Sequence, residues 1–423
     1  MIAPFAQMKR VTIFVIVAAG LIAVVIAARK KAAPVVWQVA EVQQIDAPAA
    51  ATGSAQPQLS VQGDTLLLSW IELINADATL KFAERTSTGW SAARKVSAGR
   101  DWFVNWADVP SVVRLADGSL AAHWLQESAA SPYAYDVRLA FSRDEGQSWT
   151  QATSPHHDGT PTEHGFASLF QAPGAGLGLV WLDGRDMKAA KPDEEPSGSM
   201  GLRAAVFDRQ GAQVSETVVD DRVCECCPTA AAVTSDGPII AFRDRSQDET
   251  RDIYLSRLAD GRWSEPQPVH RDNWQINACP VNGPAISASG RDVAIAWFTV
   301  ADDQGRVFVA FSADAGRTFA PPVRVDDVSA IGRVDVELLP GGAAIVSWIE
   351  VAGQRSEFRI RRVSRSGQRD ESMSVAGITA NRSSGFPRMA RRGDELVFAW
   401  TDTEAVGSRV RAATARLTTS GTK

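Results

Sequence analysis

The chain has 423 residues, a length that permits either several domains or one large repeat structure. Its 44 basic and 49 acidic side chains give a net charge of −5, which offers no basic field for a phosphate backbone and argues against a nucleic-acid partner. Hydrophobic residues make up 45 % of the chain and charged residues 22 %, a composition typical of a folded protein.

The first 31 residues differ from the rest of the chain. Lys9 and Arg10 precede an uncharged apolar run over 11–28, and a basic cluster at 29–31 follows it. Such a run is just long enough to span a bilayer. Because a basic cluster stands where a small-residue cleavage site would be expected, the pattern favours an uncleaved membrane anchor over a cleaved signal peptide.

Residues 32–57 are expected to form a linker. The stretch at 47–57 is rich in Ala, Pro, Gly and Ser, as linkers commonly are. Earlier in the same segment, the sequence VVWQVAEVQ at 35–43 has a pattern that suits an outer β-strand.

Seven apolar runs in the remaining sequence each end near an aromatic residue. Successive aromatic residues are 51 to 61 positions apart, a spacing that indicates one supersecondary unit per repeat. The seven aromatic residues, called anchors below, are Trp70, Trp124, Trp181, Phe242, Trp297, Trp348 and Trp400.

Each repeat contains the pattern of four short antiparallel strands joined by turns, without helical periodicity. Four-stranded units of this length predict an all-β propeller over 58–423, with seven blades favoured and six as the alternative. The last repeat ends before a fourth strand can form. We therefore expect residues near 35–43 to supply that strand and to close the ring, which removes exposed sheet edges.

Two turns within the repeats share the motif Ser-x-Asp-x-Gly-x-x-aromatic. Asp can accept hydrogen bonds from turn amides, Gly provides a positive φ, and the aromatic residue packs into the blade. The two copies are Ser142, Asp144, Gly146, Trp149 and Ser312, Asp314, Gly316, Phe319. These turns resemble the Asp boxes, or BNR repeats, of the sialidase (neuraminidase) superfamily. The resemblance covers nearly everything after the linker and implies a propeller placed outside the cytoplasm.

Catalytic sialidases of this superfamily resemble one another in an arginine triad, a Tyr nucleophile paired with Glu, and an Asp acid/base. This chain departs from that pattern. Its three tyrosines, Tyr133, Tyr135 and Tyr254, all precede the last three repeats, where such a nucleophile would be expected. The sequence at 358–361 superficially resembles the family's arginine motif but lies late in the chain. A sialidase activity is therefore not the first expectation.

In such blades the loops that precede the first strands and those that join the second and third strands open on one face, called the upper face here. All four Cys fall in these loops, and so do four of the five His. An exported protein permits a disulfide between Cys279 and another Cys; alternatively the thiols bind copper or zinc, or are unpaired or redox-active. The candidate metal ligands are Cys224, Cys226, Cys227, Cys279, His164 and His270.

Acidic residues two positions after several anchors belong to the same face. They suit general acid–base catalysis or a hard cation, or they cap strand ends by accepting loop amides. The catalytic candidates are Asp183, Asp244, Glu350 and Asp402. Arginines in the same loops can bind an anion, and tryptophans there either form a platform for a sugar or close the rim. The ligand-binding candidates are Arg185, Arg245, Arg333, Trp102, Trp106 and Trp274.

These patterns predict a monomeric propeller anchored in the inner membrane, with its blades in the periplasm or extracellular space. We expect its Cys/His-bearing face to bind a metal ion or a protein partner. The alternatives are an exo-acting glycoside hydrolase that uses Asp and Glu of the upper loops on a glycan, and a structural assembly factor for a membrane complex.

Overall fold

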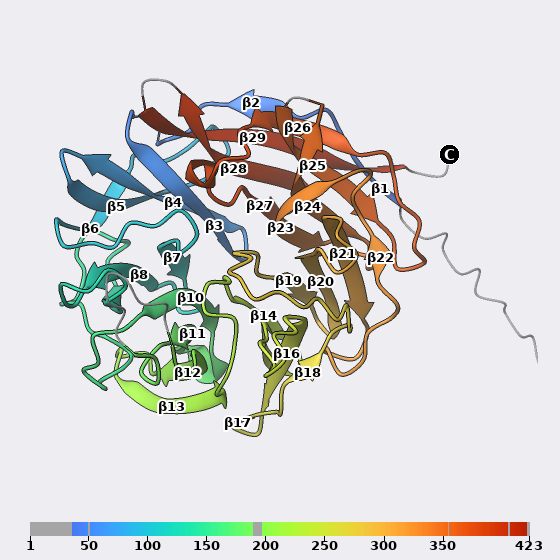
Figure 1. The fold of residues 1–423 in the computed structure, drawn as a ribbon. Coiled ribbons are helices and arrows are strands. Elements are labelled where there is room, and N and C mark those ends of the chain that lie inside the picture. Colours follow the sequence, from blue (N-terminus) through green and yellow to red (C-terminus); the bar gives the residue numbers. More distant parts are fainter. Residues whose placement is uncertain (1–35, 50, 189–196, 354, 405–406, 421–423) are drawn as a thin grey trace, which may run out of the picture. The chain divides into compact units, whose positions relative to one another are not determined.

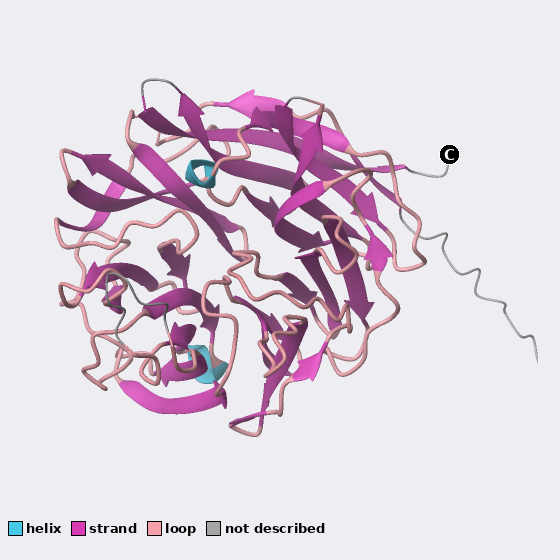
Figure 2. Ribbon diagram, in the orientation of Figure 1, coloured by secondary structure: helices cyan, strands magenta, loops and turns pink. Residues whose placement is uncertain are grey.

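The computed structural model describes residues 36–49, 51–188, 197–353, 355–404 and 407–420. Within these ranges the chain forms a ring of seven antiparallel sheets around a central channel, with no α-helix (Figures 1 and 2). The anchor predicted over 1–31 lies outside the described residues. Among the residues that are described, no helix could cross a membrane.

In blades one to six, the strands follow one another in chain order from the channel outward. Blade one consists of β3 (Ser54–Gln62), β4 (Thr65–Ile74), β5 (Asp77–Glu84) and β6 (Arg94–Gly99). Blade two consists of β7 (Ser111–Arg114), β8 (Leu120–Glu127) and β9 (Tyr135–Ser142). Blade three consists of β10 (His164–Gln171), β11 (Leu177–Asp183), β12 (Gly201–Phe207) and β13 (Gln213–Asp220). In blade two, an isolated bridge between Leu139 and Thr153 takes the place of a fourth strand.

The later blades repeat this order. Blade four consists of β14 (Ala230–Thr234), β15 (Gly237–Arg243), β16 (Ile253–Ala259), β17 (Arg262–Trp263) and β18 (Gln267–Pro268). Blade five consists of β19 (Ala285–Ser289), β20 (Asp292–Thr299), β21 (Arg306–Ser312) and β22 (Val323–Arg324). Blade six consists of β23 (Ala330–Leu338), β24 (Ala344–Ala352), β25 (Arg355–Val363) and β26 (Met373–Ile378). Two short 3-10 helices, Pro173–Ala175 and Arg382–Ser384, interrupt the strands.

The N-terminal and C-terminal segments together complete blade seven. This blade contains β27 (Arg388–Arg392), β28 (Glu395–Glu404), β29 (Gly407–Ser420), β1 (Val36–Val39) and β2 (Gln43–Ile45). Both β1 and β2 pair with β29, and Val36 lies opposite Ser420. The indole of Trp37 also donates a 2.8 Å hydrogen bond to the carbonyl of Pro340 in blade six. Residues near 35–43 therefore provide the closing strand at the place expected from the sequence.

All seven anchor aromatics lie in the second strands of their blades, and none is more than 4 % exposed. They pack between neighbouring sheets: Phe82 of blade one and Trp124 of blade two belong to one apolar cluster. Burial of such large side chains contributes about 1.5–3 kcal/mol each, so the spacing of the anchors marks the main interfaces of the ring.

The turns at 142–149 and 312–319 have the same hydrogen bonds. Asp144 accepts bonds from the hydroxyl of Ser142 and from the amide and hydroxyl of Ser148, and the amide of Gly146 donates to the Ser142 hydroxyl. Asp314 and Ser312 repeat this pattern in blade five. Gly146 has φ +79°, and a Cβ there would lie 2.5 Å from Phe82, so both backbone and packing require glycine.

Several inner strands begin with a bulge that is held by the preceding blade. The amide of Phe166 (φ +50°) donates to Asp108, and the amide of Arg333 (φ +55°) donates to Asn282, each at 2.7 Å. Asp108 and Asn282 precede the first strands of blades two and five, so neighbouring blades are joined at the upper face. These bonds fix the backbone around the mouth of the channel.

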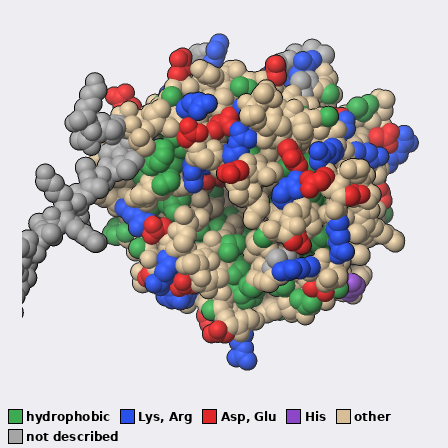
Figure 3. All heavy atoms as spheres, turned by 180° about the vertical axis from the view of Figure 1, so that it is seen from behind, with side chains coloured by type: hydrophobic (Ala, Val, Ile, Leu, Met, Phe, Trp, Pro, Cys, Tyr) green, Lys and Arg blue, Asp and Glu red, His purple; other side chains and the backbone are tan. Residues whose placement is uncertain are grey.

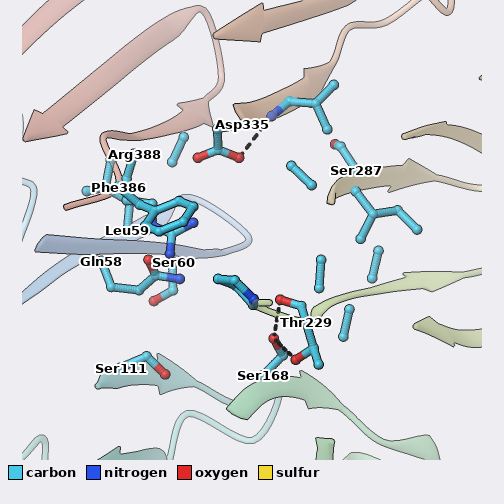
Figure 4. Close-up of a pocket in the computed structure, with 18 of the residues that line it drawn as sticks. Gln58, Leu59, Ser60, Ser111, Ser168, Thr229, Ser287, Asp335, Phe386 and Arg388 are labelled. Atoms are coloured by element: carbon cyan, nitrogen blue, oxygen red, sulfur yellow. Dashed lines mark hydrogen bonds between the residues drawn. The ribbon is translucent and has the colours of Figure 1, made fainter. Parts of the chain in front are cut away.

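The channel is a cavity of about 470 Å³ lined by the inner strands of all seven blades. Small hydroxyl side chains line much of it, including Ser60, Ser168 and Thr229 (Figure 4). Seen from behind, the molecule is hollowed at its centre, where hydrophobic side chains gather, and charged side chains of both signs surround the hollow (Figure 3). The surface therefore shows no field of one sign on that face.

Candidate active site at the channel mouth

Tyr135, Glu163 and Asp108 meet at the upper end of the channel. The hydroxyl oxygen of Tyr135 lies 2.5 Å from Oε1 of Glu163 and 3.1 Å from Oδ2 of Asp108. Tyr135 begins β9, Glu163 immediately precedes β10, and Asp108 precedes β7. The ring of Phe103 stacks on the ring of Tyr135, with centroids 3.9 Å apart. Tyr135 is buried, whereas Glu163 is half-buried.

The hydrogen-bond geometry requires a proton on one of the two carboxyl groups. A phenol has a single hydrogen to donate, yet its oxygen lies within hydrogen-bond distance of both Asp108 and Glu163. Burial raises the pKa of Glu163 to about 8, with further contributions from the charges of Asp108 and Glu225. Burial also raises the pKa of Asp108 to about 7. Glu163 is therefore able to hold a proton at neutral pH.

Four charged residues of blade four form a closed ring of ion pairs beside Glu163. Glu225 contacts Arg251 at 3.0 Å and Arg245 at 3.3 Å, and Glu249 contacts the same two guanidinium groups at 3.0 and 2.8 Å. Glu225 thus presents a carboxylate held by two cations. Because each arginine is paired with two carboxylates, neither presents an unpaired charge to a ligand carboxylate.

The four cysteines meet next to this ring. Cys226 and Cys279 form a disulfide that joins the loops preceding β14 and β19, and hence blades four and five. Cys224 and Cys227 are buried thiols, and the sulfur of Cys224 lies 3.9 Å from that of Cys226 and 3.4 Å from Arg251. Of the alternatives open from the sequence, the disulfide to Cys279 is present, with two free thiols beside it.

The predicted ligands His164 and His270 are not brought to the cysteines. His164, the first residue of β10, is buried among His156, Asp158 and Asp183. His270 is 44 % exposed and lies 3.8 Å from Asp272 in blade four's last loop. A single metal site that combines all six predicted ligands is therefore not formed.

Most acidic residues two positions after an anchor have structural roles. Asp183 accepts the indole N–H of Trp181 at 2.9 Å, and Glu72 accepts that of Trp70 at 3.0 Å. Glu350 accepts the amides of residues 327 and 328. Glu350 thus accepts loop amides as the capping alternative predicted, whereas Asp183 and Glu72 position the anchor indoles of their own strands.

The other two catalytic candidates lie in blades four and seven. Asp244 is half-buried, and burial followed by the charge of Asp220 raises its pKa to about 7. Asp402 in blade seven is paired with Arg411 at 3.3 Å.

The candidate ligand-binding residues are mostly committed to the protein itself. Arg185 pairs with Asp183 and Glu216, Arg245 belongs to the ring described above, and Arg333 donates to Ser384 and to the carbonyl of Gly385.

Among the predicted tryptophans only one is left partly open. Trp102 stacks on Trp124 and is 8 % exposed, and Trp274 is covered by Arg243 and is 6 % exposed. Trp106 is half-buried, stacks on Phe386 and lies under the guanidinium of Arg333. Trp102 and Trp274 therefore cannot serve as an open platform, and the ring of Trp106 is already in contact with Phe386 and Arg333.

Sequence reasoning missed Asp108, Glu163 and Glu225, and it set Tyr135 aside. These residues come from loops of three different blades and share no spacing, so no motif connects them. One available signal was position: Glu163 and Glu225 occupy the loops that precede the first strands of blades three and four, in the same loops as His164 and the cysteines.

No protein-family model matches the chain, and no curated protein sequence matches it. Solved structures do match. A protein of unknown function from Dyadobacter fermentans is 10 % identical with a TM-score of 0.50, over 91 % of this chain and 100 % of that one. The polysaccharide lyase Uly1 is 9 % identical with a TM-score of 0.54, over 90 % and 99 %. The NanB sialidase from Streptococcus pneumoniae is 8 % identical with a TM-score of 0.47, over 90 % and 95 %. At such identities the similarity concerns the fold.

Proposed function

We propose that the protein is a glycoside hydrolase whose general acid is Glu163. The observation that carries the proposal is the placement of Glu163, half-buried at the channel mouth with its carboxyl against Tyr135, beside the ion-paired carboxylate of Glu225. Hydrolysis of a glycosidic bond uses two carboxyl groups in unlike states, one that donates a proton and one that acts as a base or nucleophile. We assign the first role to Glu163 and the second to Glu225.

The charges of the mouth favour a glycan without acidic groups. Arg245 and Arg251 each already face the two carboxylates of Glu225 and Glu249, and Asp108 is a further acidic group beside the protonated Glu163. The arginines at 359 and 361 lie in blade six and pair with Glu357 and Asp327. These four arginines are therefore not free to bind a sialate carboxylate, and we propose a neutral sugar as the substrate.

The test is a screen of neutral and acidic oligosaccharides with two readouts, new reducing ends and ultraviolet absorbance of unsaturated products. Hydrolysis of a neutral glycan that is lost in Glu163→Gln and kept in Glu357→Gln supports the proposal. Glu357 is a suitable control because it is a paired carboxylate on the outer part of blade six. Formation of unsaturated products from an acidic polysaccharide would instead assign an eliminating enzyme.

A thiol-based metal site is the second candidate. The sulfur atoms of Cys224, Cys226 and Cys227 all lie within 4.8 Å of one another, and Cys279 is bonded to Cys226. Reduction of the disulfide would therefore place four thiols together, a donor set that suits copper(I) or zinc. Metal analysis of the protein purified with and without a reductant tests this: stoichiometric metal only in the reduced form supports it, and none in either form contradicts it.

The location of the protein remains part of the proposal. A disulfide between blades four and five suits an oxidising compartment, and the apolar run at 11–28 suits an anchor that holds the propeller outside the inner membrane. We also propose that the turns at 142–149 and 312–319 are Asp boxes. Fractionation of cells that produce the full-length chain tests the anchoring, since release into the soluble fraction would contradict it.

A further inference from the structure

A pair of free thiols lies directly against the disulfide at the upper face. The disulfide between Cys226 and Cys279 joins the loops that precede β14 and β19, which are neighbouring inner strands of the ring (Figure 1). The thiols of Cys224 and Cys227 are each 1 % exposed. The sulfur atoms of Cys224, Cys226 and Cys227 all lie within 4.8 Å of one another. Both thiols are therefore within a short movement of the disulfide.

Cys224 is the thiol that faces the disulfide. Its sulfur lies 3.9 Å from that of Cys226. On another side of the same sulfur, Nη1 of Arg251 lies at 3.4 Å. A guanidinium group at this distance offsets negative charge on a sulfur atom, and the attacking atom in thiol–disulfide exchange is a thiolate. Cys224 thus has both a target sulfur and a supporting cation.

Cys224 and Cys227 stand at the two ends of a turn whose centre is Glu225 and Cys226. The Cα atoms at the ends of such a turn lie less than about 7 Å apart. A disulfide needs Cα atoms about 4.4 to 6.8 Å apart, so the turn allows a bond between Cys224 and Cys227. The Cα atoms of Cys226 and Cys227 are only about 3.8 Å apart, below that range. The turn therefore favours one particular second pairing.

The sulfur atoms of the cluster differ in exposure. Cys279 is exposed, as are the two residues before it, and Cys226 is half-buried. Cys224 and Cys227 are buried. The disulfide consequently lies on the solvent side of the cluster and the free thiols lie on the inner side.

We propose that the four cysteines carry out an internal thiol–disulfide exchange that moves the disulfide from Cys226–Cys279 to Cys224–Cys227. In the first step the Cys224 sulfur, after losing its proton, bonds to the Cys226 sulfur. The bond between Cys226 and Cys279 breaks, and the Cys279 sulfur leaves with the electron pair and takes up a proton.

In the second step the Cys227 sulfur loses its proton and bonds to the Cys224 sulfur. The bond between Cys224 and Cys226 breaks, and the Cys226 sulfur leaves with the electron pair and takes up a proton. One disulfide and two thiols are present before and after, so the exchange consumes neither an oxidant nor a reductant. Its product has no covalent joint between blades four and five, and it presents the thiol of Cys279 at the surface.

The experiment traps this product by alkylation of the folded, full-length chain, purified without a reductant, with N-ethylmaleimide. Trypsin then leaves Cys279 in the peptide 272–291 and the other three cysteines in the peptide 223–243, so the exchange separates two peptides that the original disulfide links. We expect labels on Cys226 and Cys279 and a disulfide within the peptide 223–243. Labels on Cys224 and Cys227 with the two peptides still linked overturn the proposal. The absence of any label overturns it too, because a released Cys279 thiol would react.

Two serine variants distinguish the steps. In Cys227→Ser the exchange should stop after the first step, which leaves Cys279 labelled and Cys226 unlabelled. Cys224→Ser removes the attacking sulfur, and we expect the labelling of Cys279 to slow by at least about 10-fold. Labelling of Cys279 at the wild-type rate in Cys224→Ser contradicts the proposal, since an external thiol then opens the disulfide. If either variant does not fold, the peptide map of the unsubstituted chain decides the question alone.

Discussion

The hydroxyl oxygen of Tyr135 lies 2.5 Å from Oε1 of Glu163 and joins that carboxyl group to Asp108, the residue that holds the bulge of blade three. The proposed acid is thereby tied to the framework of the propeller. Replacement of Tyr135 by Phe removes the bridge while keeping the stack on Phe103. We expect a lower Tm and a fall in kcat larger than any change in KM, because a positioned proton donor loses its support. A change in KM alone would contradict this role for Tyr135.

Closure of the ring depends on the segment that precedes blade one. Deletion of residues 36–45 removes β1 and β2 and exposes the edge of β29. We expect a clear loss of thermal stability and greater aggregation, since an unpaired strand edge is left in blade seven. Circular dichroism melting with light scattering measures both. Unchanged melting would show that the closing strand is dispensable.

The disulfide is expected to stabilise the contact between blades four and five. Its two cysteines are 53 residues apart, and a loop of that size corresponds to roughly 2–4 kcal/mol of stabilisation. Cys279→Ser should lower the unfolding free energy by about that amount and raise the count of titratable thiols in the denatured, unreduced protein from two to three. A thiol count of one would mean that Cys226 has paired with Cys224 or Cys227, and a count of two would mean that it has paired with a sulfur outside the chain.

The two repeated turns provide a matched pair of stability tests. Asp144 and Asp314 each accept hydrogen bonds from an amide and two hydroxyls. Replacement of either by Ala should cost about 1–3 kcal/mol, because several turn donors lose their acceptor. Since the turns lie in blades two and five, the two losses should add in the double variant. Denaturant titration measures them, and losses below about 0.5 kcal/mol would contradict a structural role.

The raised pKa of Glu337, which lines the channel, predicts that the stability of the protein depends on pH. Burial, followed by the charge of Asp335, raises the pKa of Glu337 from 4.5 to about 8. The folded state therefore binds more protons than the unfolded state between these values, and the free energy of unfolding falls as the pH rises from 4.5 to 8. Glu337→Gln should gain stability relative to the wild type over this range, by more than about 1 kcal/mol.

The quantity to compare is the difference in unfolding free energy between the wild type and Glu337→Gln, because other titrating groups contribute equally to both proteins. Burial lowers the pKa of His123 to about 4, which makes the stability of both proteins rise between pH 4 and 6.5. Denaturant unfolding of both proteins at several pH values gives the difference. A difference independent of pH would show that Glu337 titrates normally despite its burial and the charge of Asp335.

The sequence predicted the parts of this structure that repeat or depend on local pattern. Anchors such as Trp70 and Trp181 recur at a spacing that one blade requires, and each is buried where that spacing placed it. The strand at 35–43 was predictable because blade seven lacked one strand.

The residues of the proposed site could not be predicted in the same way. Tyr135 begins β9, whereas Glu163 and Asp108 lie in two loops of unrelated sequence. The three meet only in the folded ring, so no spacing in the chain connects them. The role of Asp183 was also hidden, since only the fold shows that it accepts the indole N–H of Trp181. Among the cysteines, the count allowed a disulfide to Cys279, but three partners were equally possible from the sequence.

The central claim, that Glu163 is a general acid, is tested most directly with two substrates of one sugar that differ in leaving group. A natural glycan needs its leaving oxygen protonated, whereas a dinitrophenyl glycoside leaves without a proton. We predict that Glu163→Gln hydrolyses the glycan at least about 100-fold more slowly than the wild type and the dinitrophenyl glycoside at a rate within about 10-fold of it. Equal losses on both substrates, or no loss on either, would contradict the assignment.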